Sequence, residues 1–273
     1  PAGLPPPARR LSGSRSMDFS IAALLAQDGI TNGAVYALLA LSLVLVFAVT
    51  RVIWVPSGEF VAFSTLTLAG LQLGKASGIA GLLVAMAVVA GLLEVLSAFR
   101  QREWKRLPLR LAAWTGAPLA IAGVLKWAAP LAPPFVVQIL LTLVAVTALG
   151  PLSYRIVYQP IAEASVLVLL IVSVALHFAM LGLGLWYFGA EGSRTPPFTS
   201  ATFDWGGVLV SGQSLLVVAT SVALIFVLAL FFNRTLYGRA LRATAVNRVG
   251  ARLAGISPAF AGMLTFTLAA LVC

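Results

Sequence analysis

The sequence predicts an all-α fold, a polytopic transmembrane helix bundle, and three observations predict it. Hydrophobic residues make up 60% of the 273 residues and charged residues 10%, whereas a soluble domain has about a quarter charged residues. The apolar residues form long blocks, each close to the ~20 residues that a helix needs to cross ~30 Å of hydrocarbon. The net charge is +10, and the cations gather between the blocks, as in short cytoplasmic loops. Most of the surface is therefore predicted to face lipid, and no nucleic-acid partner is expected.

The N-terminal residues 1–16 are rich in Pro, Arg and Ser and are predicted to be a disordered extension. Met17 follows directly, and we expect it to be the native start, with 17–273 as the transmembrane domain. A cleavable signal peptide fits poorly, because the apolar run 30–49 is too long for its core and no small-residue cleavage site follows.

Eight apolar segments are expected as spans, the last of them truncated. They are 29–50, 57–75, 79–99, 111–129, 135–154, 164–189, 213–232 and 259–273. The last segment covers about 22 Å at ~1.5 Å per residue, which is short of a full span. We therefore expect the sequence to be a fragment of a longer protein that continues beyond Cys273.

Basic loops predict the orientation. Five cations lie in 99–110, Arg155 follows the fifth segment, and 233–252 holds five arginines and no acid. If the segments alternate, these three loops lie on one side, and short basic loops remain cytoplasmic. The N-terminus is then expected outside, although the three arginines within 1–16 argue weakly against this.

Several classes of chemistry have no signature in the sequence. A single cysteine excludes an intrachain disulfide and a cysteine-based zinc site. There is one histidine, no Gly-x-x-x-x-Gly-Lys-Ser/Thr loop for ATP, no His-Glu-x-x-His and no Gly-x-Ser-x-Gly. We therefore predict no catalytic residue, no metal ligand and no cofactor in this chain.

A break at the start of the second apolar segment holds residues that could line a path for a solute. Pro56 and Gly58 interrupt regular helix, and irregular backbone at membrane depth is tolerated only where it faces protein or water. Glu59, next to Ser57 and Gly58, would there meet a cationic group of a substrate or pair internally. Alternatively, the break is a cytoplasmic turn and Glu59 lies in the first turn of the next helix, where an acid suits the dipole. The residues alone favour this second interpretation.

Other polar residues within the apolar segments are also candidates. Asn32 interrupts the first segment just before Tyr36, and it is expected at the outer membrane boundary or on a solute path. His177 lies near the middle of the sixth segment and is expected to be neutral and bonded to a neighbouring helix, rather than a proton relay. Glu94 lies near the basic loop and is expected to pair with a local cation.

Three glycines recur at a spacing of four, at Gly70, Gly74 and Gly78. On one helix they would form a small-residue stripe that another helix can approach closely. A helix end followed by a flexible loop fits the same residues equally well.

The loop 233–258 carries the most informative pattern. Apolar residues recur there every four positions, at Leu241, Ala245, Val249 and Leu253. This spacing predicts one apolar face on a short helix with arginines on its other face, ended by Gly255 and Pro258. Such a helix suits docking into a groove of a partner or lying on anionic lipid, and periodicity does not separate the two.

At this loop the sequence resembles the permease subunits of branched-chain amino acid ABC transporters, the LivH type. That family has a cytoplasmic motif, Glu-Ala-Ala-x-x-x-Gly, which docks on the ATPase subunit, and residues 249–255 occupy its place. Ala251 and Gly255 match the motif, whereas Val249 replaces the acid and Gly250 the first Ala. The segments 238–245, 33–38, 58–59 and 154–160 also resemble the family, so that the resemblance covers 29–75 and 150–273.

Two departures from the family stand out. Residues 54–57 read Trp-Val-Pro-Ser where the family usually has Asn-Phe-Ala-His before Gly-Glu, which leaves the exact substrate open. Residues 100–149 have no counterpart that we can place, and a two-span insertion is expected there.

The resemblance implies a permease subunit of a bacterial inner-membrane importer for branched-chain or related hydrophobic amino acids. The implied partners are a second permease subunit, cytoplasmic ATPase subunits that hold ATP and magnesium, and a periplasmic substrate-binding protein. Candidate residues of the substrate path are Asn32, Tyr36, Ser57, Gly58 and Glu59. Candidate residues for ATPase coupling are Arg239, Arg242, Ala251, Arg252 and Gly255.

The alternative is a stand-alone secondary transporter or channel for a small solute. Such a protein would need its own coupling-ion site, usually several intramembrane acids. Only Glu59 and Glu94 are available, which disfavours this alternative.

Overall fold

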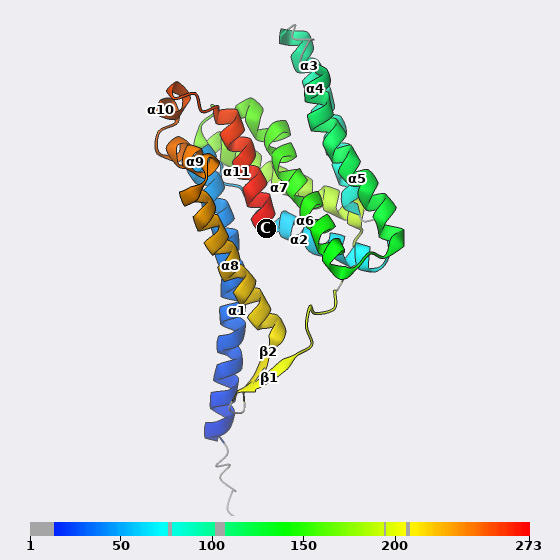
Figure 1. Ribbon diagram of the computed structural model, residues 1–273, viewed down its shortest axis with the longest axis vertical. Helices are drawn as coiled ribbons and strands as arrows, with labels where there is room; N and C mark the ends of the chain where they lie inside the picture. Colours follow the sequence, from blue (N-terminus) through cyan, green and yellow to red (C-terminus); the bar gives the residue numbers. More distant parts are fainter. Residues whose placement is uncertain (1–13, 76–77, 102–106, 194, 206–207) are drawn as a thin grey trace, which may run out of the picture. The chain divides into compact units, whose positions relative to one another are not determined.

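The computed structural model describes residues 14–75, 78–101, 107–193, 195–205 and 208–273 (Figure 1). Nearly all of them are helical. The longer helices are α1 (Ser14–Thr50), α2 (Ser57–Gln72), α3 (Gly78–Gln101), α5 (Ala117–Ala128), α6 (Phe135–Ser153), α7 (Val166–Phe188), α8 (Gly212–Arg234), α9 (Leu236–Val246) and α11 (Pro258–Val272). The shorter ones are α4 (Leu107–Leu111), η2 (Ala112–Gly116), η3 (Ala129–Leu131), η4 (Tyr154–Tyr158), η5 (Gln159–Ile161) and α10 (Arg248–Leu253).

Within the described residues, six helical segments are long and apolar enough to cross a membrane. They are Ile21–Thr50, Gly78–Arg100, Leu107–Leu131, Phe135–Ile161, Val166–Phe188 and Gly212–Arg234, and the shorter apolar Pro258–Val272 follows them. The predicted helical membrane bundle is therefore confirmed, but the expected count of eight helical spans was wrong.

The segments 57–75 and 259–273 account for the difference in count, and the second of them forms the shorter apolar Pro258–Val272. The segment 57–75 forms α2, whose 16 residues extend about 24 Å at ~1.5 Å per residue, less than the ~30 Å of a hydrocarbon core. The helix ends at Gln72, and Gly74 adopts the left-handed φ of +65°, which costs other residues about 1–2 kcal/mol. Gly70, Gly74 and Gly78 therefore do not lie on one helix, so that the small-residue stripe is wrong and the alternative, a helix end at this position, is confirmed.

The chain divides into two compact units. Unit 1 contains the described residues of Pro1–Ala37 and Pro197–Ala223, and unit 2 contains Leu38–Pro196 and Leu224–Cys273. In unit 1, β1 (Thr202–Trp205) pairs antiparallel with β2 (Val208–Ser211). Gln27 Nε2 donates a hydrogen bond of 3.2 Å to Ser214 Oγ and so links α1 to α8 within this unit. The predicted extension 1–16 falls mostly on residues 1–13, which lie outside the described residues; α1 begins at Ser14.

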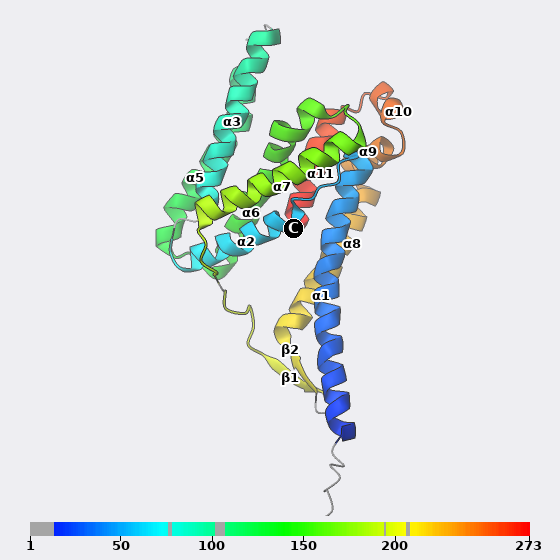
Figure 2. The same cartoon turned by 180° about the vertical axis from the view of Figure 1, so that it is seen from behind.

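The core of unit 2 lies where α2, α6 and α11 meet. A Cβ at Gly150 of α6 would overlap the backbone carbonyl of Phe266 on α11, so glycine allows these two helices their close approach. The Trp54 ring packs edge-on against Phe60 and Phe266, with centroids 4.7 and 5.4 Å apart. Beyond this core α3 runs along α5 (Figure 1), and α7 lies beside α2 (Figure 2).

Candidate functional site

A non-helical segment, residues 51–54, leads from α1 into the core before α2 begins. Arg51 takes a left-handed φ of 61° and turns the chain. Val52 and Trp54 follow, and both are buried. Pro56 then precedes the first residue of α2. Proline and the buried anchor Trp54 therefore hold the start of this helix inside unit 2, as expected for irregular backbone that is enclosed by protein.

The ends of α7 show which way this broken segment runs. Near the start of α7, Glu163 lies 3.9 Å from Arg252 of α10. Arg248 of the same helix donates hydrogen bonds to the carbonyls of Val49 (3.2 Å) and Thr50 (3.3 Å). At the other end of α7, Tyr187 lies directly against Gly78, where α3 begins. Residues 51–72 thus run in the same direction as α7 and lie along it.

Glu59 lies in the first turn of α2 and approaches His177 on α7. His177 Nδ1 is 2.6 Å from Glu59 Oε1, although the two atoms lack good hydrogen-bond geometry, and Glu59 Oε2 is buried without a hydrogen-bond partner. Since His177 is the twelfth of the 23 residues of α7, the carboxylate lies at mid-span and not in a surface turn. Glu59 thus lies in the first turn of a helix, as in the second interpretation of the break, and approaches a side chain of another helix, as in the first, so that its role on a solute path stays a prediction. His177 contacts a neighbouring helix as predicted.

The five predicted path residues belong to both compact units of the chain. Ser57 is buried and Gly58 exposed at the start of α2, next to Glu59 in unit 2. Asn32 and Tyr36 belong to unit 1 and are exposed on α1, which continues through Asn32 without interruption. Asn32 interrupts the run of apolar residues without breaking the helix, because one asparagine costs a long apolar helix little.

The predicted coupling loop forms two helices, not one. Asn247 leaves helical geometry at φ −149° and ψ 101°, and its Oδ1 accepts a hydrogen bond of 2.9 Å from Gly250 N. This is an N-cap, which ends α9 and starts α10. The single apolar face was therefore a wrong prediction: Leu241 is buried, whereas Val249 and Leu253 are 70% and 86% exposed.

The candidate coupling residues lie around this break. Ala251 is buried, and Gly255 takes a left-handed φ of +86° after α10. Arg242 Nη1 donates a hydrogen bond of 3.0 Å to Asn233 Oδ1, and Arg239 lies exposed one turn earlier. Between α9 and α10 lies a mostly apolar groove of about 590 Å³, whose lining includes Arg242, Val246 and Ala251. The structure thus brings Arg242 and Ala251 together at one groove, with Arg252 facing another pocket.

Glu94 pairs with a distant cation instead of a local one. Its Oε1 accepts a hydrogen bond of 2.7 Å from Arg155 Nε, and Arg155 Nη2 contacts the same oxygen. The side chain of Glu94 is 1% exposed. The Arg155 guanidinium also lies 5.8 Å from the centre of the Trp114 ring, within the usual range for a cation–π contact. This network joins α3, η2 and η4.

Sequence reasoning did not identify several residues that hold the break before α2 and the α9–α10 region in place. Trp54, Arg248 and Tyr154 were not singled out, since each depends on a neighbour far away in the chain. A signal was available for Trp54, because a large aromatic beside Pro56 at a helix break favours an enclosed break over a surface turn. Among the described residues, no group of three or more His, Cys, Asp or Glu could hold a metal ion.

Comparison with known proteins adds a family to this geometry. A family model described as "Branched-chain amino acid transport system / permease component" matches residues 110–273, which is more than half of the chain. The chain belongs to this family of permease components. No curated protein and no solved structure matches it.

The matched range of this permease component contains the break between α9 and α10. It also contains Arg155, the residue that pairs with Glu94. The family model also matches residues 110–149, which are most of the segment 100–149 expected to be an insertion. The two-span insertion itself stays a prediction. The family expected from the resemblance is confirmed, and the LivH type stays a prediction. As a permease component with several helices able to cross a membrane, the chain is a multi-pass membrane protein of amino-acid transport.

Proposed function

We propose that this permease component is one subunit of a bacterial ATP-binding-cassette importer for branched-chain or related hydrophobic amino acids. It would lie in the inner membrane with a second permease subunit, and a periplasmic binding protein would deliver the solute. Two cytoplasmic ATPase subunits would hold ATP and magnesium, because this sequence has no phosphate-binding loop of its own.

The capped break between α9 and α10 is the observation that carries the proposal. Three apolar side chains are exposed at this break, Val246 at 88%, Val249 at 70% and Leu253 at 86%. They lie beside the apolar groove between the two helices. Exposed apolar side chains next to a groove are typical of a docking site for another protein. The five arginines of 233–252 favour the cytoplasmic side for this surface.

The Glu59–His177 pair suggests how the path would recognise an amino acid. Glu59 Oε2 is buried without a partner, and a buried carboxylate oxygen gains most from a charge-assisted hydrogen bond. The α-ammonium group of an amino acid is such a donor. We propose that Glu59 accepts it, with Ser57 and Gly58 beside it.

Replacement of Gly255 by tryptophan tests the coupling role. No heavy atom lies close enough to obstruct a Cβ there, but the left-handed φ of +86° strains any other residue and would change how α10 leads into α11. Gly255→Trp is expected to insert normally and bind its partners weakly, with uptake of labelled leucine reduced at least tenfold. Normal ATP-driven uptake by this variant would refute the docking assignment, and Glu191→Gln, an exposed change after α7, serves as the control.

A stand-alone transporter coupled to protons is the second candidate, and the Glu59–His177 pair at mid-span is the observation that favours it. The two functions differ in their energy source. An importer subunit would give no uptake in proteoliposomes without ATPase partners, whereas a stand-alone transporter would respond to an imposed proton gradient alone.

A further inference from the structure

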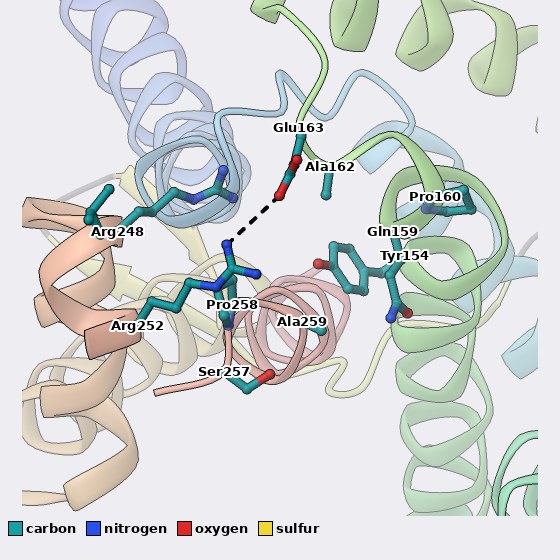
Figure 3. Close-up of a pocket in the computed structure, with 11 residues that line it drawn as sticks. Tyr154, Gln159, Pro160, Ala162, Glu163, Arg248, Arg252, Ser257, Pro258 and Ala259 are labelled. Carbon is teal, nitrogen blue, oxygen red and sulfur yellow. Dashed lines mark ion pairs between the residues drawn. The ribbon is translucent and has the colours of Figure 1, made fainter. Parts of the chain in front are cut away.

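A second pocket, of about 570 Å³, lies at the end of unit 2 where η4, α10 and the start of α11 meet (Figure 3). Its polar lining comes from distant parts of the chain: Tyr154, Gln159, Glu163, Arg248, Arg252 and Ser257. Neither the proposed path nor the groove between α9 and α10 includes this pocket.

Two guanidinium groups border the pocket. Arg248 donates from Nε and Nη2 to the last carbonyls of α1, at Val49 and Thr50, which holds its guanidinium in place and leaves Nη1 without an acceptor among the described residues. Arg252 reaches Glu163 only at 3.9 Å, and 71% of its side chain is exposed. Both arginines therefore retain donors for a bound anion, which the planar guanidinium group suits well.

Tyr154 points its hydroxyl into the same space (Figure 3). The residue is 3% exposed, and its hydroxyl has no hydrogen-bond partner among the described residues. The ring cannot easily turn away, because it packs on Phe266 with centroids 5.2 Å apart and lies so close to Gly262 that a Cβ there would overlap it. The hydroxyl therefore stays directed into the pocket, where it can donate a hydrogen bond to an oxygen of a bound ligand.

The start of α11 adds a third source of positive potential. Pro258 and Ala259, its first two residues, line the pocket, and the 15-residue helix directs the positive end of its dipole there. The end of α1 and the beginnings of α7 and α11 also lie at this end of unit 2, where helices of a membrane protein reach the level of the lipid headgroups.

We propose that this pocket binds a phosphate group, carried either by an anionic lipid headgroup or by a soluble phosphate. Arg248, Arg252 and the Tyr154 hydroxyl donate to its oxygens, and the N-terminus of α11 stabilises its charge. Glu163, with 92% of its side chain exposed, is the one carboxylate in the lining and opposes the bound anion. Its removal should therefore strengthen binding, which a merely structural role would not predict.

Native mass spectrometry of the full chain in detergent tests the proposal with phosphatidylglycerol, phosphatidylcholine and inorganic phosphate as probes. Loss of one hydrogen bond to a charged group weakens binding by about tenfold or more. Arg252→Gln and Tyr154→Phe should each weaken phosphatidylglycerol binding by about that factor, and Glu163→Gln should strengthen it. Arg234→Gln, an exposed arginine outside the pocket lining, should bind as the parent chain does.

The probes separate the two sources of phosphate. Binding of phosphatidylglycerol but not phosphatidylcholine, without competition from inorganic phosphate, identifies a lipid headgroup. Competition by inorganic phosphate that is lost in Arg252→Gln identifies a soluble phosphate. Equal binding of all probes by the parent, Arg252→Gln and Tyr154→Phe chains would overturn the proposal. The measurement needs neither transport nor partners, so its outcome is independent of the function proposed above.

Discussion

The Nδ1 atom of His177 lies 2.6 Å from Oε1 of Glu59, and this approach joins the middle of α7 to the first turn of α2. The two residues are 118 positions apart in the sequence. Their meeting places a carboxylate inside unit 2, in a helix that follows the non-helical residues 51–54.

A double-mutant cycle should detect this contact. Glu59→Gln and His177→Ala are each expected to lower the thermal stability of the detergent-purified chain, with a coupling free energy of about 1–3 kcal/mol, because the residues touch. The measurement is heat-induced loss of the monodisperse peak in size-exclusion chromatography. Strictly additive losses would show that the two side chains do not interact. Glu59→Gln should also reduce uptake of labelled leucine in the assembled importer at least tenfold, while His177→Ala in the same assay reports on the positioning of Glu59.

Removal of Arg155 should be more damaging than removal of a surface arginine. Arg155→Met leaves Glu94, 1% exposed, as a buried charge without its partner, which costs about 3–5 kcal/mol. The double change Arg155→Met with Glu94→Gln should recover most of that loss, because no uncompensated charge remains. Arg100→Met, at the exposed end of α3, is the control and should change stability by less than about 0.5 kcal/mol. A failure of Glu94→Gln to rescue would count against the pairing.

The contact between α6 and α11 should reject a single methyl group. Gly150→Ala brings a Cβ into overlap with the carbonyl oxygen of Phe266, and backbone cannot move aside cheaply. We expect a loss of about 1–3 kcal/mol in thermal stability from such overpacking. Gly123→Ala is matched in chemistry but meets no atom within 4 Å in α5, and it should be neutral or stabilise by up to about 1 kcal/mol. Equal effects of the two changes would contradict the close packing of α6 on α11.

The cap at Asn247 should decide whether α9 and α10 stay separate. Asn247→Ala removes the acceptor of Gly250 N, and loss of such a cap costs about 1 kcal/mol. Hydrogen–deuterium exchange at residues 248–253 is expected to rise several-fold, and binding of the ATPase partner is expected to fall. Asn247→Asp retains a capping oxygen and should behave as the parent chain. Unchanged exchange in Asn247→Ala would show that tertiary packing alone maintains the break.

The predictions from sequence succeeded where the signal was local and repeated many times. Six segments such as Val166–Phe188 are apolar over their whole length, and no packing detail changes what such a composition requires in lipid. The prediction failed at 57–75, where the 16-residue helix ends at Gln72 and the residues after it lengthen the predicted segment toward a full span. It also failed at 241–253, because a capped break at Asn247 does not disturb a four-residue spacing in the sequence.

By itself, the sequence determined that this chain is a multi-pass helical membrane protein with a basic loop after its seventh apolar segment. That follows from composition, since lipid requires long apolar helices and retains cations outside them. Only the tertiary structure decided that Glu59 meets His177, that Glu94 pairs with Arg155 across 61 positions, and that Tyr154, Arg248 and Arg252 share a pocket. Those contacts depend on which helix faces lie together, and side-chain packing between distant segments sets this.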